Sequence, residues 1–226
     1  MNDEDSTYRD PQKSNREEAP FSCLLAEAST VARGVLESVQ ALAGTTYCKG
    51  VQINELYKFA VERNCWFENP DVFGIFTDRG SENEVYMSAD SKTVYKLNDF
   101  RYADDNLNPF FERIKVHNFF FPDCAYSLVG FSRNRDSNVC AVLSQPFIYA
   151  KREATEEEIA STLIELGFLP CLNGEYYSNG VYDIFDATPN NVLMGVDGEI
   201  YFIDTIIYKS RDSNIELYKS LSPKYQ

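Results

Sequence analysis

The chain has 226 residues, of which 44% are hydrophobic and 25% are charged, and 35 acidic against 21 basic residues give a net charge of -14. This composition is typical of a soluble globular protein of about one domain. Binding to a phosphate backbone requires clustered Lys and Arg, so the charge argues against nucleic acid as a partner. The six cysteines form no Cys-x-x-Cys pair, which argues against the common zinc and redox motifs.

The sequence shows no segment for secretion or membrane insertion. The N-terminus is polar and acidic, and no apolar run approaches the ~18–20 residues of a membrane span. We therefore expect a cytoplasmic location and no membrane partner.

The N-terminal third of the chain predicts a tail followed by helices. Residues 1–20 are acidic and lack large aliphatic side chains, so we expect a disordered acidic tail. Residues 21–70 are expected to form an N-terminal helical extension. Apolar residues at helical spacing predict one helix over 22–43, ended by Gly44, and a second over 53–63.

The rest of the chain predicts two further segments, 71–148 and 149–226. In the first, we expect a β-hairpin, a helix that begins at Asn108-Pro109, and two more strands; the expected strand ranges are 84–87, 93–97, 125–131 and 139–147. In the second, Thr155 and Glu158 have the spacing of a capping box, which predicts a helix that Gly167 ends. Asp197-Gly198 between two apolar runs predicts a second hairpin, with strands over 192–196 and 199–203.

The second hairpin brings two oxygen-bearing side chains together. A two-residue turn at Asp197-Gly198 would pair Val196 with Glu199 and, at the open end, Asn191 with Asp204. An amide oxygen and a carboxylate in this arrangement suit Mg²⁺, which prefers hard oxygen ligands completed by phosphates and water.

The run Asp186-Ala187-Thr188-Pro189-Asn190-Asn191-Val192-Leu193, followed by a hairpin and Asp204, resembles the catalytic loop and metal-binding Asp of the protein-kinase-like superfamily. It is similar in particular to the compact kinase-like domains of polyvalent proteins from phages and conjugative elements, with aminoglycoside and choline kinases as wider relatives. The resemblance implies an α+β, two-lobe fold. The N-lobe would be an antiparallel sheet with one regulatory-type helix, and the C-lobe would be reduced and mostly helical, carrying the catalytic-loop hairpin.

The resemblance also implies ATP and Mg²⁺ as cofactors and a phosphotransferase activity. Asp186 would position or deprotonate the acceptor hydroxyl, while Asn191 and Asp204 would hold the metal. Lys96 stands in the Val-x-Lys setting of the phosphate-binding kinase lysine, and Glu112 would be its ion-pair partner.

The remaining nucleotide-binding residues implied by the resemblance lie on the predicted sheet. Gly80, Asn83 and Val85 would belong to the strand pair that covers the phosphates. A turn centred at Asp90-Ser91 would place Val85 opposite Lys96. Gln145 and Phe147 would form the hinge that meets adenine.

Each residue also has an ordinary structural interpretation. Lys96 could be an edge-strand lysine, Glu112 a solvated helix residue, and Asn191 and Asp204 polar groups beside a common turn. His117 is the only histidine, and a structural role on an apolar helix is the simpler interpretation. The order of all the kinase-like features along the chain favours the kinase interpretation.

Two departures from the kinase pattern keep a second function open. Thr188 stands where kinases carry a lysine or histidine that neutralises the transferred phosphoryl group, and few residues follow Asp204. We therefore expect the acceptor to be a small molecule or a hydroxyl of a partner protein. The alternative is a weak or inactive pseudokinase, acting as a nucleotide-binding or scaffolding module.

Overall fold

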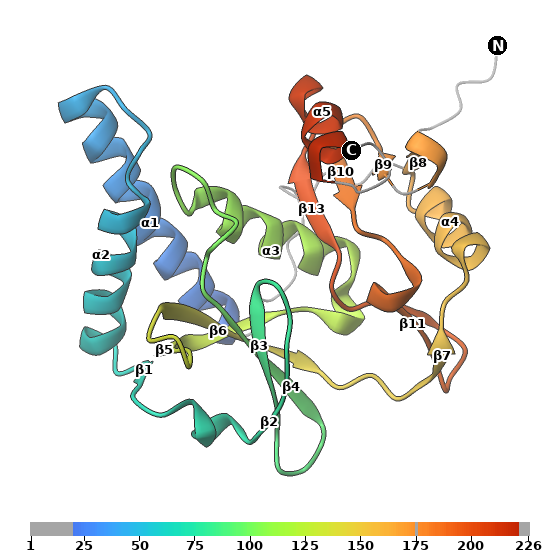
Figure 1. Cartoon of the computed structure of the whole chain (residues 1–226), viewed down its shortest axis with the longest axis horizontal. Helices are drawn as coiled ribbons and strands as arrows, with labels where there is room; N and C mark the ends of the chain where they lie inside the picture. The colour runs from blue at the N-terminus through green and yellow to red at the C-terminus, as the bar shows by residue number, and fades with distance from the viewer. Residues whose placement is uncertain (1–19, 175, 222–226) are drawn as a thin grey trace. The chain divides into compact units, whose positions relative to one another are not determined.

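The computed structural model describes residues 20–174 and 176–221, which divide into two compact units (Figure 1). The N-terminal unit comprises residues 20–118 and 123–148. The C-terminal unit comprises residues 119–122, 149–174 and 176–221. The predicted acidic tail lies outside the described residues, apart from Pro20.

The N-terminal unit contains three helices and a six-stranded sheet. The helices are α1 (Pro20–Ala43), α2 (Lys49–Glu62) and α3 (Asn108–Phe120), the last of which ends in the C-terminal unit. Both predicted N-terminal helices are confirmed, and Gly44 follows α1 with φ +64°. The strands are β1 (Trp66–Phe67), β2 (Ile75–Arg79), β3 (Asn83–Met87), β4 (Thr93–Asn98), β5 (Ser127–Arg133) and β6 (Val139–Pro146), with 3₁₀ turns at Pro70–Phe73 and Pro122–Cys124. No helix in the described part of the chain has the length and apolarity needed to cross a membrane.

The sheet has the strand order β1-β5-β6-β4-β3-β2. All its pairings are antiparallel except that of β1 with β5. The predicted β3–β4 hairpin is confirmed together with its register, because Val85 lies opposite Lys96. Along β6, Ala141 and Leu143 join one apolar cluster, whereas Cys140 and Val142 join another. This alternation follows from the two-residue period of a strand and gives each face of the sheet its own core.

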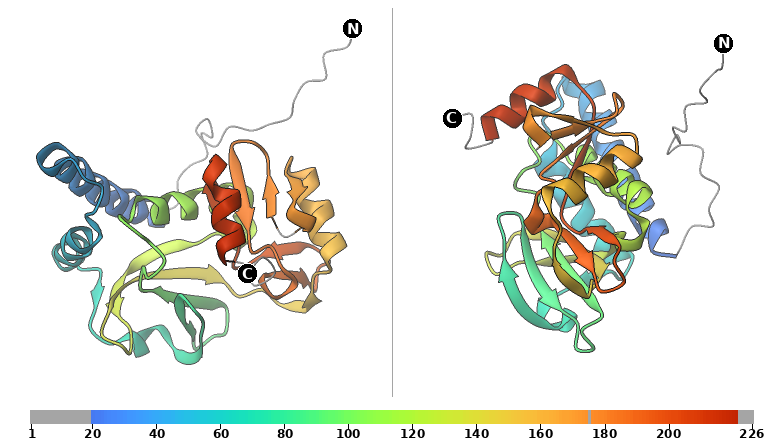
Figure 2. Two further views of the ribbon diagram at one scale, coloured as in Figure 1. Left: turned by 45° about the horizontal axis from the view of Figure 1, so that its top comes forward. Right: turned by 90° about the vertical axis from the view of Figure 1, so that its right-hand side faces the viewer.

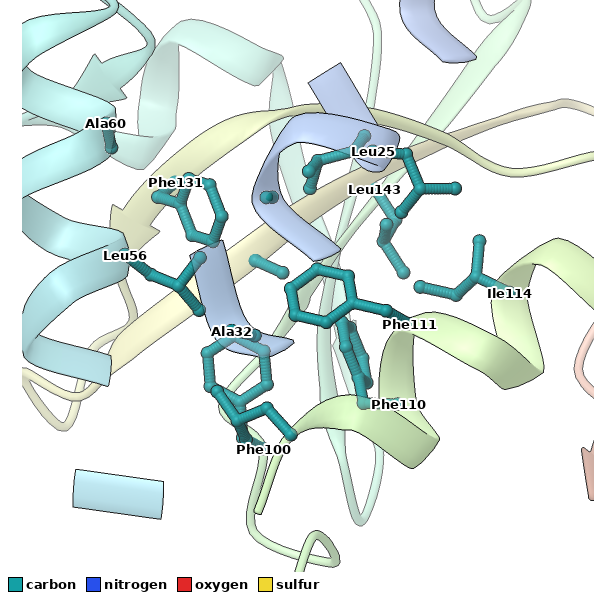
Figure 3. Close-up of a cluster of buried hydrophobic side chains, with 14 of the residues drawn as sticks. Leu25, Ala32, Leu56, Ala60, Phe100, Phe110, Phe111, Ile114, Phe131 and Leu143 are labelled. Atoms are coloured by element: carbon teal, nitrogen blue, oxygen red, sulfur yellow. The ribbon is translucent and has the colours of Figure 1, made fainter. Parts of the chain in front are cut away.

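The helices of this unit lie on one side of its sheet (Figure 2). The larger cluster lies between the sheet and these helices (Figure 3). Its members come from α1, α2, α3, β5, β6 and the loops between them; among them are Leu25, Ala28, Ala32, Leu56, Ala60, Phe100, Phe110, Phe111, Ile114, Phe131 and Leu143. The small side chains of Ala28 and Ala32 are fully buried. Because these side chains are small, α1 can pack closely against the other members of the cluster.

A buried glutamine ties the helices of this unit together. Gln52 on α2 has no exposed surface. Its Nε2 donates to the Ala32 carbonyl at 2.7 Å, and its Oε1 accepts from the Leu107 N–H at 2.7 Å. One side chain thereby joins α1, α2 and the residue before α3.

In residues 149–174 and 176–221, the C-terminal unit contains two helices and seven short strands. The helices are α4 (Glu156–Glu165) and α5 (Asp212–Leu221). The strands are β7 (Ala150–Glu153), β8 (Leu169–Cys171), β9 (Tyr176–Ser178), β10 (Tyr182–Phe185), β11 (Val192–Gly195), β12 (Ile200–Phe202) and β13 (Ile206–Lys209), with 3₁₀ turns at Leu172–Gly174 and Pro189–Asn191. They form one sheet in the order β13-β10-β9-β8 and another in the order β12-β11-β7.

This unit is therefore not mostly helical, which corrects the sequence prediction. Buried aromatic and β-branched residues such as Tyr176, Tyr177 and Ile184 occupy its strands, as expected for residues that favour a pleated surface. The predicted capping box at the start of α4 is confirmed in both directions, between the Thr155 and Glu158 side chains and backbones.

The β11–β12 hairpin forms as predicted, but its predicted register is wrong by one residue. Val192 lies opposite Phe202, and the Ile203 N–H donates to the Asn191 carbonyl at 2.9 Å. Asn191 therefore faces Ile203 and not Asp204.

The cause is a turn of three residues in place of two. The Gly195 N–H donates to the Glu199 carbonyl at 2.8 Å, and Gly198 has φ +94°, as in three-residue hairpin loops with a left-handed last position. Asp197 stabilises this turn, since it accepts hydrogen bonds from the Tyr201 hydroxyl at 2.6 Å and from the Glu199 N–H at 3.1 Å. These bonds hold the pKa of Asp197 below its ordinary value.

Candidate active site

Lys96 lies on β4 and is only 7% exposed. Its cross-strand partner on β6 is Leu143, so its side chain is on the sheet face that packs against α3. The Nζ atom donates to the Tyr126 hydroxyl at 3.0 Å and lies 5.2 Å from the centre of the Tyr126 ring. Burying an ammonium is costly unless it forms hydrogen bonds. Lys96 is therefore a buried lysine stabilised by partners, and not a surface lysine on an edge strand.

The predicted lid residues lie on the hairpins beside Lys96. The Gly80 N–H donates to the Asn83 carbonyl at 2.9 Å and closes the β2–β3 turn. The Asn83 Oδ1 accepts from Asn98 Nδ2 at 3.0 Å, and Val85 is paired with Lys96. Asn83 and Val85 thus lie on β3, next to Lys96 on β4, and Gly80 lies in the turn between β2 and β3.

The predicted hinge residues lie at the end of β6. Gln145 is buried, and its Nε2 donates to the Cys124 carbonyl at 2.6 Å. The Phe147 N–H donates to the Lys92 carbonyl at 2.8 Å. The Gln145 side chain and the Phe147 backbone N–H therefore both form hydrogen bonds within the N-terminal unit. Their contact with adenine stays a prediction.

Glu112 lies on the exposed side of α3. The buried residues of this helix include Phe110, Phe111, Ile114 and His117, so a residue at position 112 points away from the sheet. Over residues 20–174 and 176–221, the Glu112 side chain makes no hydrogen bond or ion pair. The structure does not bring it to Lys96.

In the C-terminal unit, Asp186 follows β10 with φ +58°, a left-handed backbone conformation that is uncommon for residues other than glycine. Asp186 is exposed between the buried residues Phe185 and Ala187. The Asn191 Nδ2 donates to the Asp186 carbonyl at 3.0 Å and braces this conformation. Strained backbone of this kind is concentrated at functional sites.

Two strand pairings bracket Asp204 and bring it to the same corner as Asp186 and Asn191. On one side, Ile203 is hydrogen-bonded to the Asn191 carbonyl. On the other, Ile206 lies opposite Phe185, the residue before Asp186. The predicted catalytic residue Asp186 and the predicted metal ligands Asn191 and Asp204 therefore lie at one corner of the C-terminal unit, although the register differs from the one predicted.

The buried side chain of Asp183 on β10 forms hydrogen bonds with neighbouring elements. Asp183 has no exposed surface, and it accepts hydrogen bonds from the Ser178 hydroxyl at 2.7 Å and from Asn214 Nδ2 at 2.7 Å. Burial, and then the hydrogen bond to Asp183, raise the pKa of Tyr176 well above its ordinary value. This network ties β10 to β9 and α5, three residues before Asp186.

Two side chains at this corner carry oxygen atoms of the kind that Mg²⁺ prefers. The Asn191 Nδ2 donates to the Asp186 carbonyl, and its Oδ1 accepts from Asn190 Nδ2 at 3.2 Å, so one lone pair of Oδ1 and the carboxylate of Asp204 are the oxygen ligands that would hold the ion. Beside Asp204, the Thr205 hydroxyl is buried and has no hydrogen-bond partner among the described residues, a feature that a bound group would explain. No cluster of three or more His, Cys, Asp or Glu side chains suitable for a metal occurs in the described ranges.

A model of the family described as serine/threonine/tyrosine kinase found in polyvalent proteins matches residues 49–211. The chain belongs to this family. The match covers well over half of the sequence and includes every predicted site residue from Gly80 to Asp204. No curated protein gives a significant match.

Membership of the polyvalent-protein kinase family identifies the chain as a kinase-like phosphotransferase domain. The sequence analysis did not single out Tyr126, which contacts Lys96, or Thr205, whose buried hydroxyl follows Asp204. No motif marks Tyr126, because its contact with Lys96 depends on long-range packing. Thr205 could have been noticed as the residue that directly follows the predicted metal-binding Asp204.

Proposed function

We propose that the protein is an ATP- and Mg²⁺-dependent phosphotransferase whose acceptor is a hydroxyl of a small molecule or a partner protein. The observation that carries the proposal is the corner of the C-terminal unit where Asp186, Asn191 and Asp204 meet. An aspartate braced by an asparagine amide, next to a second carboxylate, agrees with the catalytic Asp and metal-binding Asn and Asp that protein kinases use for phosphoryl transfer.

Each residue has one role in the proposed reaction. Lys96 contacts the phosphates of ATP, and Asn191 with Asp204 holds the metal. Asp186 orients the acceptor hydroxyl and takes its proton while the acceptor oxygen bonds to the γ-phosphorus. The bond from that phosphorus to the bridging oxygen breaks, and ADP leaves with the electron pair. Mg²⁺, when bound, supplies neutralisation of phosphate charge, so catalysis comes mainly from positioning and electrostatics.

A nucleotide-binding pseudokinase is the second candidate, and Thr188 favours it. Its hydroxyl donates to Asn190 Oδ1 at 2.7 Å within the catalytic loop, so a neutral group stands where the resemblance implies a cation. Loss of that cation would slow the chemical step without preventing ATP from binding.

Thermal unfolding with ATP and Mg²⁺ tests nucleotide binding. ATP with Mg²⁺ should raise the melting temperature of the wild type, because a ligand that binds only the folded state stabilises it. Asp204→Ala should lose the part of the shift that depends on Mg²⁺. Glu199→Ala removes an exposed carboxylate from the same hairpin and should keep the full shift.

Turnover separates the two candidates. Release or transfer of the γ-phosphate by the wild type, abolished in Asp186→Asn without loss of ATP binding, is the result expected of a phosphotransferase. Binding of ATP with Mg²⁺ but no turnover would favour the pseudokinase. A wild type that binds no nucleotide, or binds ATP without regard to Mg²⁺, would refute the phosphotransferase.

A further inference from the structure

We propose that Tyr126 is the residue that positions Lys96, in the role that the sequence assigned to Glu112. The inference rests on the proposed function of Lys96 at the ATP phosphates and adds a residue to that site. It follows from the contacts of a single buried ammonium and from the way its neighbour is held.

The contact itself combines two interactions. The Lys96 Nζ donates to the Tyr126 hydroxyl at 3.0 Å and also lies near the face of the ring. Both residues are nearly buried, at 7% and 9% exposure. A phenol oxygen and a ring face stabilise a desolvated cation, and since both are neutral, they do so without cancelling its charge. Tyr126 thus holds the ammonium in place without forming an ion pair with it.

The last turn of α3 fixes the position of Tyr126. Asn118 grips the tyrosine backbone at both ends: its Oδ1 accepts from the Tyr126 N–H at 2.7 Å, and its Nδ2 donates to the Tyr126 carbonyl at 2.6 Å. The His117 ring packs against the tyrosine ring with centroids 4.7 Å apart. The helix thus sets the place of the phenol, and the phenol sets the place of the ammonium.

The backbone grip makes a clean test available. Tyr126→Phe removes only the hydroxyl, because Asn118 holds main-chain atoms that any side chain would retain. The ring face and its packing on His117 are kept as well. Tyr95→Phe is the matched control: Tyr95 adjoins Lys96 in sequence but packs on the opposite face of the sheet, against Phe73.

Two measurements on the full chain decide the matter. In the ammonium region of a ¹H–¹⁵N spectrum without nucleotide, the Lys96 signal, identified by its loss in Lys96→Arg, should shift or broaden in Tyr126→Phe and stay unchanged in Tyr95→Phe. The Kd for ATP with Mg²⁺ should rise about tenfold in Tyr126→Phe, since a hydrogen bond to a charged group is lost. Tyr95→Phe should bind as the wild type does.

The outcomes distinguish this inference from the proposed function. If the wild type binds ATP with Mg²⁺ and Tyr126→Phe binds equally well, the role of Tyr126 is refuted and the phosphotransferase stands. A loss of affinity in Glu112→Gln in place of Tyr126→Phe would restore the glutamate and also overturn the inference. A wild type that binds no nucleotide refutes both, even if the Lys96 signal responds to Tyr126→Phe.

Discussion

The hydrogen bond from the Asn191 side chain to the Asp186 carbonyl gives the most direct test of the catalytic corner. Asn191→Ala removes this 3.0 Å bond from a residue that is 8% exposed. A bond of this kind contributes a net ~1 kcal/mol. Because Asp186 is exposed, water can replace the lost donor, so we expect a loss of about 0.5–1 kcal/mol in the free energy of unfolding. For a unit of this size, such a loss corresponds to a fall in melting temperature of about 2–8 °C.

A second substitution distinguishes the role of Asn191 as a hydrogen-bond donor to Asp186 from its proposed role as a metal ligand. Asn191→Asp loses the N–H donor but keeps oxygen atoms for a cation. It should lower the melting temperature at least as much as Asn191→Ala, because a carboxylate placed at a carbonyl repels it. Only Asn191→Ala should lose the part of the ATP-induced shift that depends on Mg²⁺.

Thermal unfolding of the three proteins, without ligand and with ATP in the presence and absence of Mg²⁺, gives both quantities. An Asn191→Asp variant that melts at the wild-type temperature would show that the bond to Asp186 contributes nothing. An Asn191→Ala variant that keeps the full Mg²⁺-dependent shift would remove Asn191 from the metal site.

Three further predictions concern the stability of the two units. Gln52→Leu leaves the buried Leu107 N–H without its partner and removes a donor to the Ala32 carbonyl, so it should cost about 1–3 kcal/mol in urea unfolding, whereas Gln40→Leu, at an exposed position of α1, should stay close to the wild type. At Gly74, with φ +123°, a Cβ would lie 2.0 Å from a β3 carbonyl oxygen, so Gly74→Ala should cost roughly 3 kcal/mol; Gly50→Ala, with open space around it, should be neutral or stabilising. The side chain of Arg152, and then the Thr155 N–H, lower the pKa of Glu158 to about 2. Because this folded-state pKa is below the ordinary 4.5, Glu158 stabilises the fold above pH 4.5 and loses that effect as the pH falls towards 2, so the gap in melting temperature between wild type and Glu158→Gln should shrink between pH 6 and pH 2.5.

A different result would contradict each of these predictions. Equal destabilisation by Gln52→Leu and Gln40→Leu would mean that the buried hydrogen bonds of Gln52 contribute little. A Gly74→Ala variant as stable as Gly50→Ala would mean that the 70–75 segment relaxes freely. A gap for Glu158→Gln that is the same at both pH values would contradict the lowered pKa.

The two hairpins show what the sequence determines locally and what it does not. The β3–β4 register was predictable because the polar turn at residues 88–92 fixes which residues face each other. The β11–β12 turn has an equally clear signal in Asp197-Gly198, yet two- and three-residue turns both accept that pair. In the folded chain, the Tyr201 hydroxyl donates to Asp197 and stabilises the three-residue turn. This contact lies outside the two turn residues on which the prediction of the register was based.

The helix beside Lys96 shows a limit of a different kind. The order of elements correctly predicted a helix after β4, but the identity of the residue facing Lys96 depends on the phase of α3. The apolar positions Phe110, Phe111 and Ile114 already place Glu112 on the outside of the helix, so hydrophobic periodicity could have excluded it. Tyr126 could not be found in this way, because it lies beyond the helix and reaches Lys96 only in the folded unit.

The short strands of the C-terminal unit lay beyond sequence reasoning for a third reason. β8 and β9 have three residues each and β10 has four. Runs this short show no periodicity that separates a strand from a loop. Their pairing with one another, and with β13 some twenty residues later, is a property of the whole unit.

The packing of α1 bears on how the protein can be shortened. The family model matches the chain only from residue 49 onwards, whereas Leu25 and Ala32 on α1 belong to the same core as Leu56, Phe111 and Phe131 (Figure 3). A fragment trimmed to the matched residues would expose to water the apolar side chains that α1 covers, and exposed apolar patches promote aggregation. The matched range is therefore shorter than the folded unit, and an expression fragment should start ahead of Leu25.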